Sequence, residues 1–368
     1  MFKSPIAQRR WANFKANKRA YYSLWIFAII FGITLFAEFV ANDRPILVSY
    51  QGELRAPIFS FYAETDYGGE FQTEAEYTAP EVQCLIIAGG LEACLDDPEG
   101  VIEDAEDGLV GNDPIEKGWM LWPPIPYSFD TINYNVATAP SAPDEYHMLG
   151  TDDQTRSVLA RIIYGFRISV VFAAVVVVTS TAIGLVAGAA MGFYGGWIDL
   201  FFQRVVEIWN AIPLLYTLII LSAILTMSFW LLAVIVALFS WTALIGIVRA
   251  EFLRARNFEY VRAARALGVG DWKIMFRHML PNAMVGTVTV MPFLITGAVG
   301  TLTTLDFLGF GLPPSYPSLG ELALQAKDNL QAPWLGFSAF FSITIMLSLL
   351  VFIFEGVRDA FDPRKTFS

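Results

Sequence analysis

Few residues in this chain are of the types that perform catalysis or bind metals. The two histidines, His147 and His278, lie 131 positions apart, and neither belongs to a His/Cys cluster with zinc-ligand spacing. The sequence lacks the G-x-x-x-x-G-K-[ST] loop that cradles nucleotide phosphates and the G-x-S-x-G turn that presents a nucleophilic serine. We therefore expect no catalytic residue, no metal site and no cofactor bound by this chain.

The two cysteines, Cys84 and Cys94, are the only thiols in the chain. An oxidising compartment favours a disulfide between them, and two free thiols are the alternative. Closing so short a loop would stabilise the fold by roughly 2–3 kcal/mol.

The composition points to a membrane protein. Hydrophobic residues make up 55% of the chain and charged residues only 16%, whereas about 25% is usual in soluble domains. The charge is unevenly distributed. Residues 42–150 hold 21 acids and 3 bases, a net of −18, while the remainder carries a net of +7. One acidic aqueous segment therefore interrupts an apolar, mildly basic chain.

Six stretches approach the roughly 20 apolar residues that a membrane helix needs. We expect an all-α polytopic membrane protein with a large extracytoplasmic insert between its first two helices. These spans contain almost no ionisable groups, which disfavours a carrier driven by ions. The predicted spans are Leu24–Val40, Ile168–Gly192, Ala211–Ser228, Phe229–Val248, Ala283–Leu305 and Trp334–Phe354.

The basic residues predict the orientation. Six bases and no acid precede the first span, and residues 249–281 hold seven bases and three acids. Because positive loops stay in the cytoplasm, both termini are expected inside, and the first span is expected to be an uncleaved anchor. The predicted regions are a cytoplasmic tail (1–23), the first membrane helix (24–40), a periplasmic insert (41–150), a membrane core (151–360) with a loop at 249–281, and a cytoplasmic tail (361–368).

The loop contains a segment with strong helix-forming residues, from Asn257 to Gly268. Spacing predicts that Phe258, Val261 and Leu267 share one face with Ala264, and that Gly268 ends the helix. From these residues alone, a docking element and an amphipathic loop on the lipid interface are equally favoured.

The same loop resembles the EAA loop of ABC-importer permeases, whose pattern is E-A-A, three residues, G, nine residues, I-x-L-P. Arg262 stands in place of Glu and His278 in place of Ile, as in the peptide-importer branch. In that family the loop forms coupling helices that dock on an ATPase subunit. The resemblance assigns coupling to Glu259, Arg262, Ala263, Ala264, Gly268, Leu280 and Pro281.

Two further stretches are similar to the same branch. Residues 149–169 resemble G-T-D-x-x-G-R-D-x-x-x-R-x-x-x-G-x-R-x-S, with Thr155 for Gly and Ser157 for Asp. Residues 306–320 resemble S-F-L-G-x-G-x-x-P-P-x-P-S-W-G. In this stretch Asp306 and Leu319 depart in ways typical of microcin C-type oligopeptide permeases. The resemblance covers the first span and roughly 150–360, and little of 42–148.

The resemblance implies a permease subunit of an ATP-driven peptide importer in a bacterial inner membrane. The implied partners are a second permease subunit, two ATPase subunits or one fused ATPase that bind ATP and Mg²⁺, a periplasmic solute-binding protein and membrane lipid, with no nucleic acid. Dipeptide, nickel or opine uptake is the alternative cargo. A membrane-anchored receptor or scaffold acting through the insert is the alternative class.

Two features remain. Gly184, Gly188 and Gly192 form a small-residue stripe on the second span, for which we expect close helix packing. The insert is predicted to be ordered but irregular, with short strands and a small core of its own. Its acidic run Pro98–Pro114 is predicted to be a loop.

Overall fold

The computed structural model of the chain describes residues 5–106, 109–110, 113–114, 117–134 and 136–361. Contacts divide the chain into two compact units. The helical unit comprises Met1–Phe31, Gly165–Leu330 and Gly336–Ser368, and the insert unit comprises Gly32–Tyr164 and Gln331–Leu335. Each unit has its own hydrophobic core.

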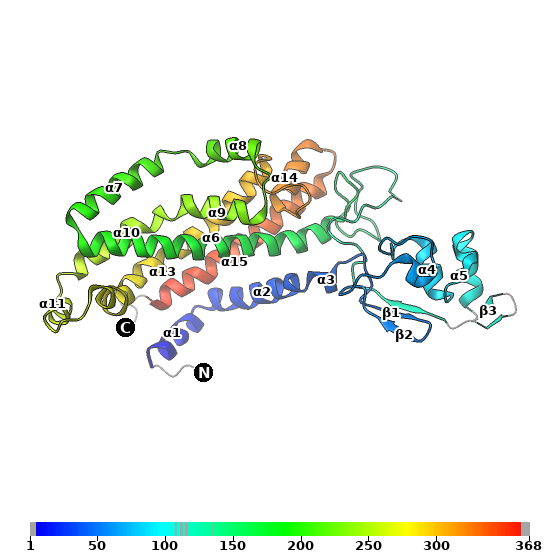
Figure 1. Ribbon diagram of the computed structural model, residues 1–368, viewed down its shortest axis with the longest axis horizontal. Coiled ribbons are helices and arrows are strands. Elements are labelled where there is room, and N and C mark those ends of the chain that lie inside the picture. The colour runs from blue at the N-terminus through cyan, green and yellow to red at the C-terminus, as the bar shows by residue number, and fades with distance from the viewer. Residues whose placement is uncertain (1–4, 107–108, 111–112, 115–116, 135, 362–368) are drawn as a thin grey trace. The chain divides into compact units, whose positions relative to one another are not determined.

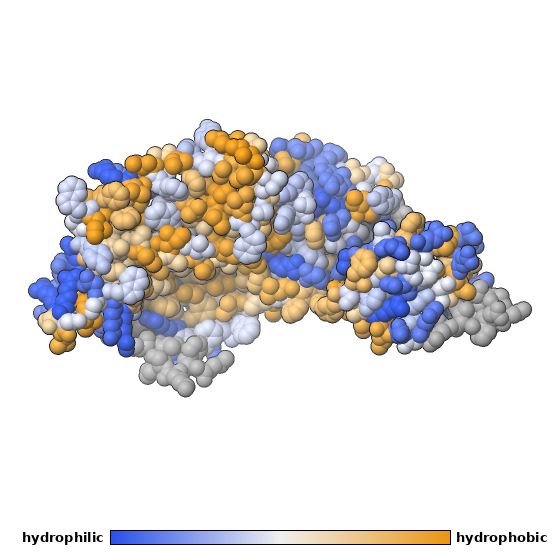
Figure 2. Space-filling model, in the orientation of Figure 1, coloured by the Kyte–Doolittle hydropathy of each residue, from blue (hydrophilic) through white to orange (hydrophobic). Residues whose placement is uncertain are grey.

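Four continuous helical stretches are long and apolar enough to cross a membrane (Figure 1). Hydrophobic residues gather over them, and hydrophilic residues gather around α11 (Glu259–Ala266) (Figure 2). Four of the predicted spans lie within these stretches. They are α6 (Val158–Tyr194), α9 with α10 (Phe229–Ser240 and Thr242–Ala255), α12 with η3 and α13 (Asp271–Lys273, Ile274–Met279 and Leu280–Phe307), and α15 (Pro333–Phe361).

The predicted span Ala211–Ser228 has the wrong bounds. The structure has instead a bent pair, α7 (Gly196–Asn210) and α8 (Leu214–Ile224), which meet at an angle of 67°. Pro213 stands directly before α8, where its missing N–H and its ring prevent the two helices from joining into one. At 11 residues, α8 is too short to cross a membrane by itself.

The bent pair carries the chain back across the helical unit. Gly184 lies beside Trp241 and Gly192 beside Phe252, so α6 and α10 run in the same direction. The rings of Phe172 and Phe229 lie 5.8 Å apart, at the level where α9 begins. Between the end of α6 and the start of α9, the chain must therefore return about 33 Å at 1.5 Å per residue. This distance matches the roughly 30 Å core of a bilayer, so α7 with α8 is a candidate for a fifth span.

The first predicted span, Leu24–Val40, is divided in the structure. Helix α1 (Pro5–Ala16) precedes α2 (Lys18–Leu35), and a break at Phe36 separates α2 from the single turn α3 (Ala37–Val40). Helix α2 is apolar after its first two residues, but it is not among the four stretches described above.

The glycine stripe brings the backbones of α6 and α10 together. A Cβ atom at Gly184 would lie 2.6 Å from the carbonyl oxygen of Trp241, and one at Gly192 would lie 2.5 Å from the Cβ of Phe252. At Gly188 the nearest atom would be the Cβ of Val248, at 2.8 Å. No side chain larger than hydrogen fits at these distances, which is the reason for glycine at all three positions.

The insert unit has the predicted short strands. A three-stranded antiparallel sheet has the order β2 (Glu53–Arg55), β1 (Leu47–Tyr50) and β5 (Trp119–Leu121), with Val48 paired to both Arg55 and Met120. The other short elements are η1 (Glu64–Tyr67), α4 (Pro80–Ile87), η2 (Glu92–Leu95), α5 (Pro98–Glu106), β3 (Leu109–Val110) and β4 (Asp113–Pro114).

The core of this unit is aromatic and cross-linked. The rings of Tyr50 and Tyr77 both lie against that of Tyr67, with centroids 5.2 and 5.9 Å away. Cys84 of α4 and Cys94 of η2 form a disulfide with their Cα atoms 5.5 Å apart, and both are fully buried. The insert therefore has the core of its own that the sequence predicted.

The sequence predicted a loop for the acidic run Pro98–Pro114, but part of this run is helical in the structure. Pro98–Glu106 forms α5, because the Asp97 carboxylate accepts the Gly100 N–H at 3.2 Å and Val101 is buried in the insert core. A capping carboxylate and one apolar anchor thus outweigh the unfavourable acidic composition.

We expect Gly192→Ala to lower the free energy of unfolding by about 1–3 kcal/mol, because its methyl group would overpack the contact with Phe252. Thermal denaturation of the purified protein in detergent measures this. Gly246→Ala is the matched control, since a Cβ there has nothing within 4 Å and alanine favours a helix. Equal loss of stability in both variants would refute the close contact.

Candidate functional site

The predicted coupling loop is an ordered structure that stands on the membrane core. Val261 and Ala264 of α11 are buried, and the guanidinium of Arg265 lies 4.8 Å above the Phe193 ring of α6. The same core contains Ala189, Phe193, Leu244, Val248, Phe252, Ala255, Val261, Ala264, Ile274, Met275, Met279 and Ala283. Side chains from α6, α10, η3 and α13 thus hold α11 in place.

The predicted apolar face of α11 is only half right. Val261 and Ala264 do share a buried face, but Phe258 is 44% and Leu267 83% exposed. The helix ends at Ala266, and the chain turns at Leu267, so the helical period does not extend that far.

The outward surface of the loop is therefore mixed in character. Ala264 packs inside its own chain, whereas its neighbour Ala263 is exposed. Leu267 and Trp272, at 83% and 66% exposure, are large apolar side chains that face away from the core. We define the coupling surface as the exposed residues Glu259, Arg262, Ala263, Ala266, Leu267, Gly268 and Trp272.

Gly268 shapes the end of α11. Its φ of +74° lies in the left-handed region that side chains disfavour, and no atom lies within 4 Å of an added Cβ. Its N–H donates to the Arg265 carbonyl at 2.9 Å, and the Val269 N–H donates to the Ala264 carbonyl at 3.1 Å. Glycine is therefore required here for backbone conformation and not for space.

The other residues predicted to act in coupling lie in α11 and at the start of α13. Arg262 donates from Nε and Nη2 to the Asn257 carbonyl, at 3.0 and 2.8 Å. Glu259 is in the first turn of α11, where a carboxylate is favoured by the helix dipole. Leu280 packs against the core around α11, and the exposed Pro281 stands in the first turn of α13.

Sequence analysis missed the π-helix η3 (Ile274–Met279), which leads from the loop into α13. Such segments are rare in proteins, and those that occur are often at functional sites. Ile274, Met275 and Met279 of this segment are buried in the core around α11, and no residue type in the sequence signals the wider turn.

The stretch 149–169 contains a buried ion-pair cluster in the insert unit. Asp152 is fully buried, and its carboxylate accepts the Arg156 Nε–H at 2.8 Å. Arg161, 1% exposed, lies 3.5 Å from the same carboxylate. Removing one member of such a cluster would leave a buried charge without compensation, so these residues are structural anchors.

The departure at Thr155 is informative. Its φ is +62°, the left-handed region in which glycine is favoured. Thr155 compensates with its side chain, because Oγ1 accepts the Asn133 N–H at 3.1 Å. The turn is thus the same one that glycine would form, with an added tie to a neighbouring segment.

Asp306 organises the third motif. Its carboxylate is buried, accepts the Leu312 N–H at 2.7 Å and accepts the Ser318 hydroxyl. A Cβ at Gly311 would lie 1.8 Å from Asp306 Oδ1, so the loop folds tightly around the carboxylate. Ser318 also caps α14 (Leu319–Asp328) by accepting the Gly320 N–H at 3.1 Å. This ordering role was not predicted.

Within the described residues, no group of three or more His, Cys, Asp or Glu side chains could hold a metal ion. Asp199 and Arg249 form a two-pronged ion pair, at 2.5 and 2.7 Å, that ties α7 to α10. The helical unit thus presents, at α11 and the turn after it, an exposed surface anchored to the membrane core.

Comparisons with known proteins agree with this arrangement. Residues 184–367 match the family described as binding-protein-dependent transport system inner membrane component. Residues 4–62 match the N-terminal TM domain of oligopeptide transport permease C.

Similar proteins cover nearly the whole chain. The peptidoglycan transport system permease protein YejE of Agrobacterium fabrum is 51% identical, over 99% of this chain and 94% of its own. The inner membrane ABC transporter permease protein YejE of Escherichia coli is 48% identical, over 98% of both chains. The oligopeptide transport system permease protein OppC of Bacillus subtilis is 32% identical, over 66% of this chain and 80% of its own. The chain belongs to the family of binding-protein-dependent transport system inner membrane components, the permeases of ABC importers.

Proposed function

We propose that this chain is one permease subunit of an ATP-driven peptide importer in a bacterial inner membrane. It forms the translocation path with a second, non-identical permease subunit. Two ATPase subunits, separate or fused, bind ATP and Mg²⁺ on the cytoplasmic side, and a periplasmic solute-binding protein delivers the peptide.

The coupling surface carries this proposal. The chain has no nucleotide-binding loop of its own, so the energy for transport must come from a partner. Helix α11 and the turn after it present Ala263 and Leu267 to the outside, while Val261 and Ala264 fix the helix to α6 and α10. A force applied to this surface would reach the membrane helices through packed side chains.

Peptide as cargo is supported by the relatives. Besides the two YejE proteins, they include a dipeptide transport permease, DppC of Haemophilus influenzae, which is 35% identical over 59% of this chain. The names of these relatives support small peptides as the shared class of cargo.

We further propose six spans with both termini in the cytoplasm, with α2 and α3 as the first. The match of residues 4–62 to an N-terminal TM domain supports this count. The insert then lies in the periplasm, where its disulfide is chemically stable.

The topology is tested with single added cysteines. A cysteine at Asn257 should be labelled by a membrane-impermeant maleimide only in inside-out vesicles, and one at Glu103 only in intact spheroplasts. Both positions are exposed. The unmodified chain, whose two cysteines are joined, is the background control. The reverse labelling pattern would overturn the orientation.

The coupling role is tested with Ala263→Trp in the assembled importer. We expect normal membrane insertion and a loss of peptide uptake of at least about tenfold, because an indole on the coupling surface prevents close approach of a partner. Uptake of a labelled peptide and peptide-stimulated ATP hydrolysis are the measurements.

Ala12→Trp, at an exposed alanine of α1, is the matched control and should transport normally. Ala264→Trp is less informative, because its ring would disrupt the core under α11. Full uptake by the Ala263→Trp importer would exclude docking at this surface and favour a receptor or scaffold that acts through the insert.

A further inference from the structure

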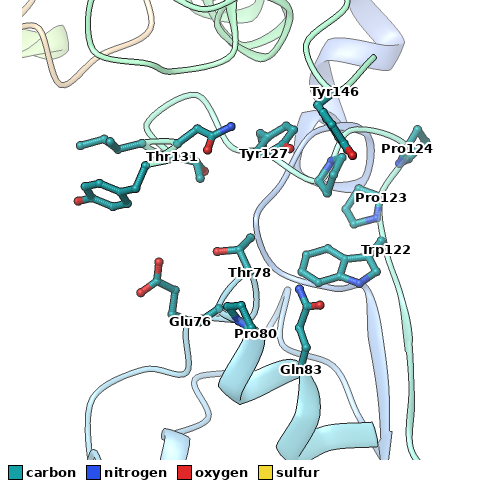
Figure 3. Close-up of a pocket in the computed structure, with 15 residues that line it drawn as sticks. Glu76, Thr78, Pro80, Gln83, Trp122, Pro123, Pro124, Tyr127, Thr131 and Tyr146 are labelled. Atoms are coloured by element: carbon teal, nitrogen blue, oxygen red, sulfur yellow. The ribbon is translucent and has the colours of Figure 1, made fainter. Parts of the chain in front are cut away.

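The insert unit contains a pocket of about 950 Å³ (Figure 3). One wall comes from Glu76 and Thr78 in the segment that leads into α4 and from Gln83 of α4 itself, and the other comes from residues within 122–134 and Tyr146. Pockets of 300–1,000 Å³ are typical of sites for small ligands, and this one accommodates a short peptide segment.

The walls of the pocket are rich in aromatic rings. Trp122, Tyr127, Tyr134 and Tyr146 all line it, and prolines fill much of the surface between them. Tyr134 is 83% and Tyr146 69% exposed, so most of each side chain is accessible to a ligand. Aromatic faces attract ammonium and guanidinium groups and stack on the planar groups of extended peptides.

The carboxylate of Glu76 lies at the edge of the pocket. Figure 3 shows the Glu76 side chain extending toward the open space, and no lysine or arginine in the described part of the chain forms an ion pair with it. The nearby bases are engaged elsewhere. Arg44 pairs with Glu74 at 2.7 Å, and Arg55 lies 5.1 Å above the Tyr67 ring.

Hydrogen bonds behind the walls hold the pocket in shape. His147 is 2% exposed, its Nε2 is hydrogen-bonded to Asn133 Nδ2 at 2.9 Å, and its ring centroid lies 4.5 Å from that of Tyr127. The Asp144 carboxylate accepts the Tyr146 N–H at 2.9 Å. Burial lowers the pKa of His147, so near neutral pH its ring adds no positive charge to the pocket.

We propose that this pocket binds the lysine or arginine side chain of a free, extended peptide. The cation would lie between Glu76 and the aromatic faces, and the peptide backbone would lie along the tyrosines and prolines. The permease would then carry a cargo-binding site on its own insert. The identification of this ligand as the transported peptide rests on the proposed function.

Equilibrium binding to the purified full-length chain, without partner subunits, tests the site. The probe is a fluorescent N-acetylated, C-amidated tetrapeptide with one lysine, and its counterpart has norleucine in place of lysine. We expect the lysine peptide to bind, the norleucine peptide to bind about tenfold more weakly, and Glu76→Gln to weaken lysine-peptide binding about tenfold.

Two variants make the test specific. Glu81→Gln removes a carboxylate that is also exposed, from the first turn of α4 and outside the pocket, and should leave binding unchanged. Tyr134→Ala removes a largely exposed ring and should weaken binding without unfolding the insert. Equal losses from Glu76→Gln and Glu81→Gln would indicate a diffuse negative field and overturn the pocket, as would equal binding of the two peptides.

Two further outcomes separate this inference from the proposed function. If neither peptide binds but the assembled importer transports peptides normally, the pocket assignment fails and the importer function stands. If Glu76→Gln weakens association with the solute-binding protein but free peptides do not bind, the occupant is a basic segment of that protein and the proposal is overturned.

Discussion

The backbone contact between α6 and α10 is the interaction from which the geometry of the helical unit follows. Three glycines of α6 face the carbonyl oxygens of Trp241, Ile245 and Arg249, so α6 contributes no side chain at these three points of contact. Phe193 of α6 and Phe252 of α10 both belong to the buried cluster on which α11 is packed. The coupling surface lies outside the apolar helices. Its position nevertheless depends on the three glycines of α6, which lack side chains and so let α10 approach closely.

The insert unit is stabilised by different interactions from those of the helical unit. Its core depends on tyrosines, a disulfide and a small sheet, as expected of a compact aqueous domain with limited apolar area. The charge of residues 42–150 is screened by salt beyond ~8 Å, so it acts mainly on the capture of ligands at short range. In the pocket, one carboxylate of this acidic segment, Glu76, has a defined position beside aromatic side chains.

Several features were predictable because each leaves a mark in the sequence. The glycine spacing, the two isolated cysteines and the turn at Gly268 each have one simple physical cause. The bend at Pro213, the helix at Pro98–Glu106 and the exposure of Leu267 were not predicted in their actual form. They depend on which neighbours are present: α5, for example, forms because Val101 is buried in the insert core. Composition and periodicity do not contain that information.

The glycine contact is also periodic on both of its sides. The glycines recur every four residues, and so do the facing carbonyls of Trp241, Ile245 and Arg249 and the facing Cβ atoms of Leu244, Val248 and Phe252. One helix displaced along the other by a single repeat, about 6 Å, would bring two of the three notches back into register. The interface thus has no room for a larger side chain between the helices. Its regular spacing nevertheless permits a second alignment, in which one helix is displaced along the other by one turn.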